Sequence, residues 1–214
     1  MLRPCRTLLI LPAMLVLSVS ARADIFLFAN LTHDQETNTG PLTTSTGDPR
    51  PLSFGTALFD LNDAKTAMKF TATIYNIDIT GTQTEDTNDN LRAAHIHASP
   101  TAAPNTNAPV VWGFFGAPFN DNNPNDVVVT PFASGVGGTI SGKWDLPEGN
   151  NTTLDAQLQN ILTGHSYINF HTVQFGGGEI RGFPTLVPEP GTLALLAGLG
   201  VSALGLLARR LRRR

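Results

Sequence analysis

The sequence contains almost no cysteine. Its single cysteine, Cys5, lies close to the amino terminus, so the rest of the 214-residue chain carries no thiol. Disulfide bonds, cysteine-ligated metal sites and thiol catalysis are therefore excluded beyond that position. Without disulfides, the folded part of the chain depends on an apolar core, and a chain of this length can bury an adequate one.

Basic residues are also scarce between the two ends of the chain. Residues 24–187 contain six of the 14 Lys and Arg residues but 16 of the 17 Asp and Glu residues, which gives this segment a formal charge of −10. A surface with so large an excess of negative charge repels phosphate backbones. We therefore expect no nucleic acid among the partners of this protein.

The first 23 residues are typical of a secretory signal peptide. Arg3 and Arg6 precede the apolar run Leu8–Val19, and Ala21 and Ala23 form a small-x-small cleavage site. A charged segment, an apolar run and such a site are the three parts of a signal peptide. The apolar run is shorter than the roughly 17–25 residues that a membrane span needs. We expect cleavage after Ala23 and export of the remainder.

The carboxyl-terminal segment has the composition of a membrane span with a basic end. Residues 191–208 contain no charged side chain, and residues 209–214 contain five arginines. At ~1.5 Å per residue, a helix over the uncharged segment is about 27 Å long, close to the thickness of the hydrocarbon core. The sequence predicts a transmembrane helix at about 191–208, with the arginine-rich tail on the cytoplasmic side.

Together with Pro188, Glu189 and Pro190, this tail resembles the PEP-CTERM sorting signal of Gram-negative bacteria. The three parts of that signal occur in order within residues 188–214: a Pro-Glu-Pro motif, a short span and an arginine-rich end. The resemblance implies recognition and cleavage by an exosortase-type processing enzyme. It also implies that a membrane-anchored precursor is delivered to the cell surface or the extracellular matrix.

Between the terminal segments, short apolar stretches alternate with loops. A polar residue at every second place of an apolar stretch indicates a strand that is buried on one face. Such stretches lie at 25–31, 54–61, 68–77, 91–97, 110–115, 127–132 and 138–144, and two more lie within 163–182. We expect one helix at 152–162 and a long exposed loop at 32–51. These elements predict an all-β domain over residues 24–187, a Greek-key β-sandwich with one short helix.

Three of these stretches carry polar side chains on one face. Side chains two residues apart in a strand point to the same side of the sheet. The residues that share a face in this way are His95 with His97, then Tyr167 with Asn169 and His171, and finally Glu179 with Arg181.

The motifs around these residues resemble the CHRD domain, a module first described in the developmental regulator chordin. The family pattern includes Ala-His-Ile-His, present in this chain at 94–97, and Gly-x-x-Tyr-x-Asn-x-His-Thr, present at 164–172. It also includes Gly-Gly-Glu-Ile-Arg-Gly, present at 177–182, and Ser-Gly-x-x-Glu after the first strand, which residues 31–36 match loosely. The resemblance implies an immunoglobulin-like β-sandwich and an extracellular location, and it supplies no established activity.

The polar residues allow two interpretations. In the first, a buried polar seam is formed by His95, His97, Asn169, His171, Glu179 and Arg181. Glu179 would then pair with Arg181 or a histidine, and Asn169 would hold the backbone of a loop.

In the second interpretation, His95, His97 and His171 bind a metal ion. Three imidazoles and a carboxylate are a suitable ligand set for Zn²⁺ or Cu²⁺, which bind imidazole nitrogen at ~2.0–2.1 Å. The sequence itself leaves both interpretations open.

The sequence offers no nucleophile elbow of the Gly-x-Ser-x-Gly type, and we expect the protein not to be an enzyme. We expect it to act in the envelope or the extracellular matrix, without a cofactor, by binding exopolysaccharide or another surface protein. The alternative is a zinc- or copper-binding module centred on His95, His97 and His171.

Overall fold

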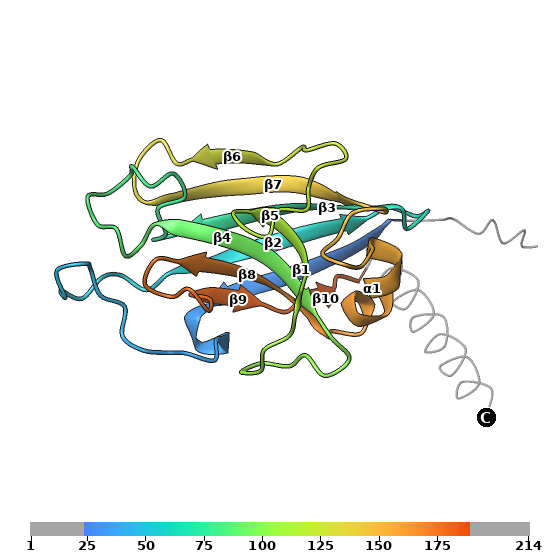
Figure 1. Cartoon of the computed structure of the whole chain (residues 1–214), viewed down its shortest axis with the longest axis horizontal. Coiled ribbons are helices and arrows are strands. Elements are labelled where there is room, and N and C mark those ends of the chain that lie inside the picture. Colours follow the sequence, from blue (N-terminus) through green and yellow to red (C-terminus); the bar gives the residue numbers. More distant parts are fainter. Residues whose placement is uncertain (1–23, 189–214) are drawn as a thin grey trace, which may run out of the picture.

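Ten strands form one continuous sheet in the computed structural model, which describes residues 24–188 (Figure 1). The strands are β1 (Ile25–Thr32), β2 (Phe54–Leu61), β3 (Ala67–Tyr75), β4 (Leu91–Ala98), β5 (Val110–Phe115), β6 (Val128–Pro131), β7 (Gly137–Asp145), β8 (Ser166–Thr172), β9 (Ile180–Gly182) and β10 (Thr185–Leu186). A 3₁₀ helix, η1 (His33–Gln35), follows β1, and an α-helix, α1 (Leu154–Leu162), precedes β8. The predicted all-β class with one short helix is confirmed.

Several sequence predictions concern segments that lie outside the described residues. These are the signal peptide at 1–23 with Ala21 and Ala23, the sorting residues Glu189 and Pro190, and the span and arginine-rich tail at 191–214. Within residues 24–188, no helix is long and apolar enough to cross a membrane.

The sheet curls so that its two ends face each other. The strand order is β5-β4-β8-β9-β1-β2-β3-β7-β6, and β10 pairs with β1. Strands β9 and β1 are joined through a single residue pair, Arg181 with Thr32, and the sheet bends there from one layer into the next. The layer β5-β4-β8-β9 thereby lies over the layer that contains β1, β2, β3 and β7 (Figure 1).

Aromatic side chains fill the space between the two layers. Trp112 of β5 stacks on Trp144 of β7, with ring centroids 5.5 Å apart and an angle of 5° between the rings. Phe114 of β5 lies against Phe70 of β3, with centroids 4.5 Å apart. All four residues are buried, and such pairs add to the stabilisation that comes from burial alone. The core therefore joins strands that are far apart in the sheet order.

Strands β2 and β3 form a hairpin. The two strands pair along their whole length, from Phe54 opposite Tyr75 to Leu61 opposite Met68. Every second residue of β3 is buried, and Lys69 between two of them is exposed. This alternation is what buries one face of a sheet while the other remains in water.

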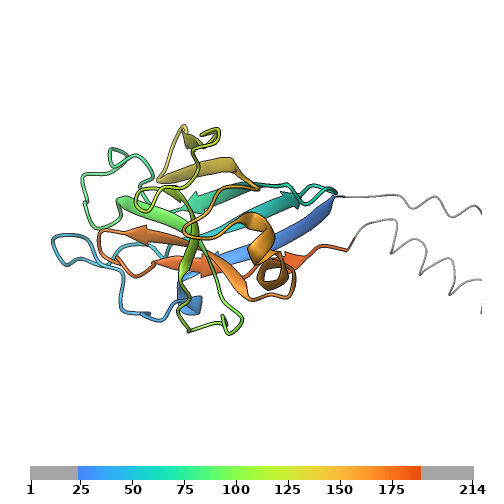
Figure 2. The ribbon, with the colours of Figure 1, turned by 45° about the vertical axis from the view of Figure 1, so that its right-hand side comes forward.

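Strand β8 is buried on both faces, although its sequence predicts a strand buried on one. Ile168 and Phe170 face the core. The other face, with Tyr167, Asn169 and His171, is buried as well. Segments 33–50 and 99–109 lie beside β8 and β9 in both views of the ribbon (Figure 1, Figure 2).

The long exposed loop predicted for residues 32–51 is therefore only partly correct. The segment has little regular structure, but His33 and Glu36 are buried and the side chain of Arg50 is only 5% exposed. Polar side chains on a covered sheet face need partners that water cannot supply, and this segment supplies them.

Replacing Trp112 with Ala should lower the free energy of unfolding by about 3–5 kcal/mol, because the change leaves a cavity between the layers. Denaturant unfolding followed by circular dichroism measures this loss. Phe26→Ala serves as the control, since Phe26 is 47% exposed on the outer side, and it should lower stability by less than about 1 kcal/mol. Equal losses in the two variants would contradict the role of the tryptophan pair.

Candidate metal centre

The outer face of β4, β8 and β9 carries the polar residues identified in the sequence. Cross-strand pairing places His95 opposite Asn169, and Asn169 opposite Arg181, in one row across the three strands. His97 lies opposite Tyr167 in the neighbouring row. The loops above this face decide what these side chains contact.

His95, His97 and His171 converge on this face. One ring nitrogen from each lies within 4.8 Å of the other two, and the three residues are 5%, 7% and 7% exposed. No other group of three His, Asp or Glu residues within residues 24–188 has the spacing of a metal site.

Backbone carbonyl groups fix the tautomers of these imidazoles. A carbonyl oxygen only accepts hydrogen bonds, so a ring nitrogen that faces one must donate. His95 donates from Nε2 to the carbonyl oxygen of Ala117 at 3.1 Å. His97 donates from Nδ1 to the carbonyl oxygen of Ala108 at 2.8 Å. In the neutral rings, the lone pairs therefore lie on Nδ1 of His95 and Nε2 of His97.

The third histidine follows the same rule. His171 donates from Nδ1 to the carbonyl oxygen of Gly176 at 3.1 Å, which leaves a lone pair on Nε2. That Nε2 lies 3.2 Å from Nδ1 of His95, and Nε2 of His97 is buried without a hydrogen-bond partner. Two lone pairs at this distance repel each other unless a cation lies between them.

The geometry fits a zinc or copper ion. Two nitrogen ligands at ~2.0–2.1 Å from a tetrahedral ion are about 3.3 Å apart. The separation between the facing nitrogens of His95 and His171 is 3.2 Å. Histidines that bind metals usually donate their other N–H to a carbonyl or carboxylate, which orients the ring. Each of the three histidines has such an acceptor, and each acceptor comes from a different loop.

The three rings are held in the neutral form that metals bind. Burial lowers the pKa of His171 to about 3, and His95 and His97 act in the same direction. Burial also lowers the pKa of His97 to about 4, and it lowers the pKa of His95. Protons therefore compete with a metal for these nitrogens only in acidic solution.

A cavity of about 590 Å³ borders the three rings. Its other lining residues are Arg92, Ala93, Val110, Ala117, Thr172, Val173 and Gly176. Three nitrogen ligands leave one position of a tetrahedral ion open, and the cavity provides room for a further ligand there.

Tyr167 supports His97 from two directions. Its ring stacks on the imidazole, with centroids 4.7 Å apart and an angle of 6°. Its hydroxyl oxygen accepts the N–H of Ala108, whose carbonyl oxygen accepts from His97. The guanidinium carbon of Arg181 lies 4.4 Å from the centre of the same ring. The orientation of His97 is thus set by a side chain and a loop together.

Arg181 pairs with Glu36, whereas the polar-seam interpretation paired it with Glu179. Nε of Arg181 donates to Oε2 of Glu36 at 2.7 Å, and Nη2 donates to the same oxygen. Nη1 donates to the carbonyl oxygen of Thr106 at 2.7 Å. Both side chains are almost completely buried. Removing one partner of such a pair leaves a buried charge and typically costs about 3–5 kcal/mol.

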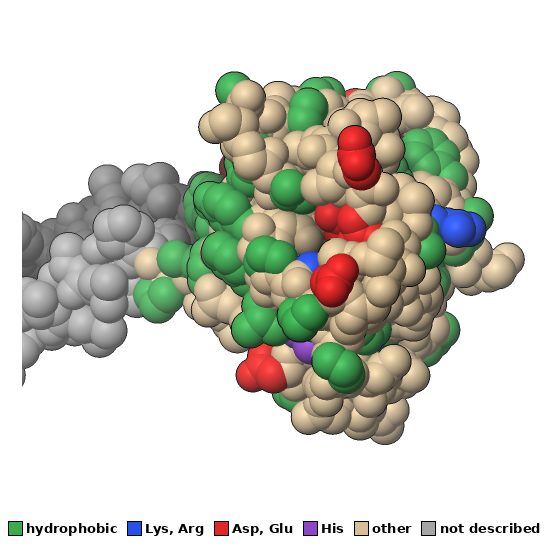
Figure 3. All heavy atoms as spheres, turned by 90° about the vertical axis from the view of Figure 1, so that its left-hand side faces the viewer, with side chains coloured by type: hydrophobic (Ala, Val, Ile, Leu, Met, Phe, Trp, Pro, Cys, Tyr) green, Lys and Arg blue, Asp and Glu red, His purple; other side chains and the backbone are tan. Residues whose placement is uncertain are grey.

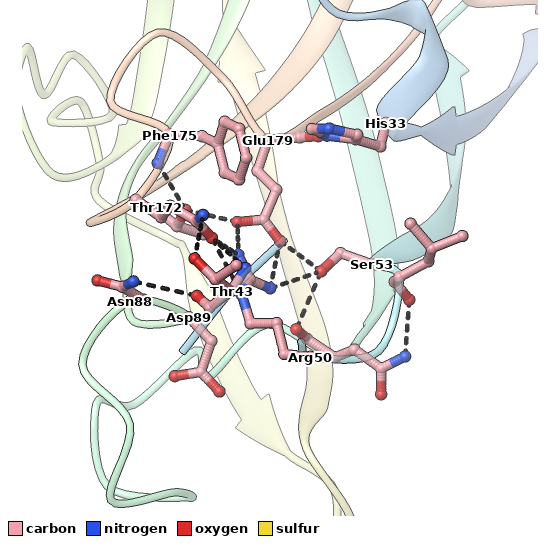
Figure 4. A network of polar contacts seen from close by, with 12 residues as sticks. His33, Thr43, Arg50, Ser53, Asn88, Asp89, Thr172, Phe175 and Glu179 are labelled. Carbon is pink, nitrogen blue, oxygen red and sulfur yellow. Dashed lines mark hydrogen bonds and ion pairs between the residues drawn. The ribbon is translucent and has the colours of Figure 1, made fainter. Parts of the chain in front are cut away.

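Glu179 pairs with Arg50, as Figure 4 shows. Nη1 of Arg50 donates to Oε1 of Glu179 at 2.9 Å, and Nη2 donates to Oε2. The hydroxyl groups of Ser53 and Thr172 donate to the same carboxylate. The predicted pairing of the Glu179 carboxylate with Arg181 or a histidine is therefore wrong, because Arg50 in the loop before β2 engages it. The one histidine contact of Glu179 in the described part of the chain is through its backbone, whose carbonyl oxygen accepts from Nδ1 of His33 at 2.6 Å.

The role predicted for Asn169 is also wrong. Neither polar atom of its buried amide has a hydrogen-bond partner among the described residues, so it does not hold a loop backbone. The amide lies against Gly178, which has a φ of +124°. A Cβ at Gly178 would lie within 2.6–2.7 Å of both amide atoms and 2.6 Å from Oε1 of Glu36. The absence of a side chain at Gly178 is what lets these groups approach.

Sequence reasoning missed several parts of this site. Glu36 had a weak signal, since it stands where the loose family match at 31–36 has its glutamate. Nothing in the sequence marked Arg50 or the carbonyl groups of Ala108 and Ala117. These groups reach the site through loop paths that have no periodic pattern.

Comparison with protein-family models places a CHRD domain at residues 27–183. The chain belongs to the CHRD family. A second family model, the PEP-CTERM protein-sorting motif, matches residues 186–214. The CHRD domain is thus followed by a signal that exosortases recognise, and the protein is exported and sorted to the surface of a Gram-negative bacterium. No curated protein and no solved structure matches the chain.

Acidic side chains gather on a different part of the CHRD domain. Figure 3 shows them grouped at the end of the sandwich that lies opposite α1. One carboxylate in the loop at this end, Asp78, accepts the backbone N–H groups of Thr80, Gly81, Gln83 and Thr84. This carboxylate closes its own loop, and the acidic residues within 24–188 form no group with metal-site spacing.

Lowering the pH should destabilise the metal-free CHRD domain through His97 and His171. Their pKa values of about 4 and about 3 lie below the ordinary value of 6.5. Below about pH 6.5, the unfolded chain therefore binds protons that the folded domain does not. Each histidine should then lower the free energy of unfolding by about 1.4 kcal/mol per pH unit until its folded pKa is reached.

Denaturant unfolding of chelator-treated protein over this pH range tests the effect. Burial raises the pKa of Asp121 to about 6, so this group titrates in the same pH range, and its protonation stabilises the folded state as the pH falls. Asp121 is present in both the wild type and His97→Gln, so the difference between these two proteins isolates the effect of His97. The variant should show the shallower pH dependence. Equal slopes for wild type and His97→Gln would contradict the prediction.

Proposed function

We propose that this CHRD-family protein binds one zinc or copper ion through His95, His97 and His171. The observation that supports this most directly is the set of three tautomers. Each ring donates one N–H to a carbonyl oxygen, so each must direct its lone pair toward the other rings. A purely structural seam would leave two lone pairs facing each other at 3.2 Å, whereas a bound cation makes all three favourable.

The ligand set narrows the choice of metal. It contains three imidazole nitrogens and no carboxylate, since Glu36 and Glu179 are engaged by Arg181 and Arg50. Imidazole ligands suit zinc and copper, whereas calcium and magnesium require oxygen. The proposal therefore favours the second of the two sequence interpretations, with the buried seam as its supporting layer.

The cellular setting follows from the two family matches. The chain carries an exosortase-recognised signal, so export and sorting are established at that level. We propose in addition that a precursor is first anchored in the membrane by its carboxyl-terminal helix. The protein is then released to the cell surface or the extracellular matrix.

A second, non-enzymatic role is supported by aromatic rings on the opposite layer. Phe54 of β2 stacks on Tyr75 of β3 with centroids 4.8 Å apart, and Phe132 lies 5.0 Å from Tyr75. Phe54 and Tyr75 are 49% and 40% exposed. Exposed aromatic patches often mark interaction sites. In this role the domain binds exopolysaccharide or another surface protein in the envelope, without catalysis.

Purified exported protein should contain close to one zinc or copper ion per chain, and His97→Ala or His171→Ala should lose most of it. Removing one of three ligands leaves too few nitrogens for tight binding. Elemental mass spectrometry after dialysis measures the metal content.

His165→Ala is the matched control, because His165 lies outside the cluster and its Nδ1 faces the carbonyl oxygen of Ala102. This variant should keep its metal. A wild type without metal after incubation with zinc and copper salts, combined with normal folding, would disprove the proposed site.

Deleting residues 191–214 should release the protein into the periplasm or the medium, because the predicted membrane span and the arginine-rich end are removed. Fractionation of the bacterium and immunoblotting measure the distribution. A deletion variant that stays in the membrane fraction would contradict the sorting role of the tail.

A further inference from the structure

We propose that the metal centre takes a small organic carboxylate as its further ligand, with Arg92 as the second contact of that carboxylate. The inference rests on the proposed metal site and adds the class of molecule that the site binds. Three observations carry it: the charge of the ligand set, the charge of the cavity lining, and the size of the cavity.

The ligand set does not neutralise the metal. Three neutral imidazoles add no negative charge to a divalent ion. The two buried carboxylates of this layer are already neutralised, Glu36 by Arg181 and Glu179 by Arg50. A buried charge without a counter-charge is unstable. The centre therefore favours an anion in its open coordination position.

The cavity wall has a charge that is opposite to that of the domain as a whole. Residues 24–187 carry a formal charge of −10, yet no acidic residue lines the cavity. Its one charged lining residue is Arg92, which is exposed. Within residues 24–188, Arg92 forms no ion pair, so its guanidinium group is available to a ligand.

The size and the lining of the cavity favour an organic anion over a bare inorganic ion. The volume of about 590 Å³ far exceeds that of a single small ion. Ala93, Val110 and Val173 offer apolar contacts for carbon atoms, as in most small-molecule sites. The planar guanidinium group of Arg92 matches the geometry of a carboxylate. Metal, arginine and aliphatic wall together define a site for a small carboxylic acid.

Acetate binding to the cobalt-loaded protein tests this inference. Cobalt(II) replaces zinc with a visible spectrum that reports changes in its ligands. Titration with acetate should change this spectrum and saturate, whereas methyl acetate, which has no charge, should have no effect. Azide serves as the inorganic control, because it carries the same single negative charge as acetate.

Variants identify the second contact. Arg92→Ala should weaken acetate binding about tenfold, the loss expected for one charge-assisted hydrogen bond at a partly open site. The acetate affinity of Arg92→Lys should lie between those of the wild type and Arg92→Ala. Lys69→Ala removes an exposed positive charge from the opposite layer and should bind acetate like the wild type.

The outcomes separate the two proposals. Failure to bind cobalt would overturn the metal site and this inference with it. Stoichiometric cobalt without a response to acetate would overturn the inference alone, and so would a response to azide but not to acetate. Unchanged acetate affinity in Arg92→Ala would also overturn the inference, because Arg92 would then make no contact with the carboxylate.

Discussion

The burial of polar side chains on the outer face of β4, β8 and β9 is the constraint on which the site depends. Once loops cover this face, each polar group must find a partner within the protein or lose the hydrogen bonds that water supplied. Two arginine–glutamate pairs and three histidine–carbonyl bonds meet most of this demand. The loops are therefore held by the same contacts that orient the histidines.

The aromatic core between the layers and the polar outer face of β4, β8 and β9 have different roles. The aromatic core between the layers provides stability in a domain that has no disulfide, with Trp112 of β5 stacked on Trp144 of β7. The outer face of one layer carries the polar residues of the candidate metal centre. Carbonyl acceptors orient its three histidines, and burial keeps them neutral, which is the form that the proposed metal site requires.

The glutamates and the histidines of this face differ in whether their polar atoms have partners. Glu36 and Glu179 are satisfied by arginines and serve the structure. Nε2 of His97 has no partner, and the facing nitrogens of His95 and His171 cannot satisfy each other as neutral rings. A cation at this position would satisfy all three nitrogens, which is the basis of the proposed metal site.

The sequence by itself determined the all-β class, the polar face of each strand and the sorting tail. These follow from periods of two residues and from local composition, which depend on near neighbours in the chain. It also named His95, His97 and His171 as candidate ligands, but the two-residue period relates only His95 to His97. The pairing of β4 with β8 is what brings His171 beside them. Only the tertiary structure decided which groups meet across loops. Arg50 reaches Glu179 and Glu36 reaches Arg181 through segments without periodic pattern, so their pairing depends on how the whole chain closes over the sheet.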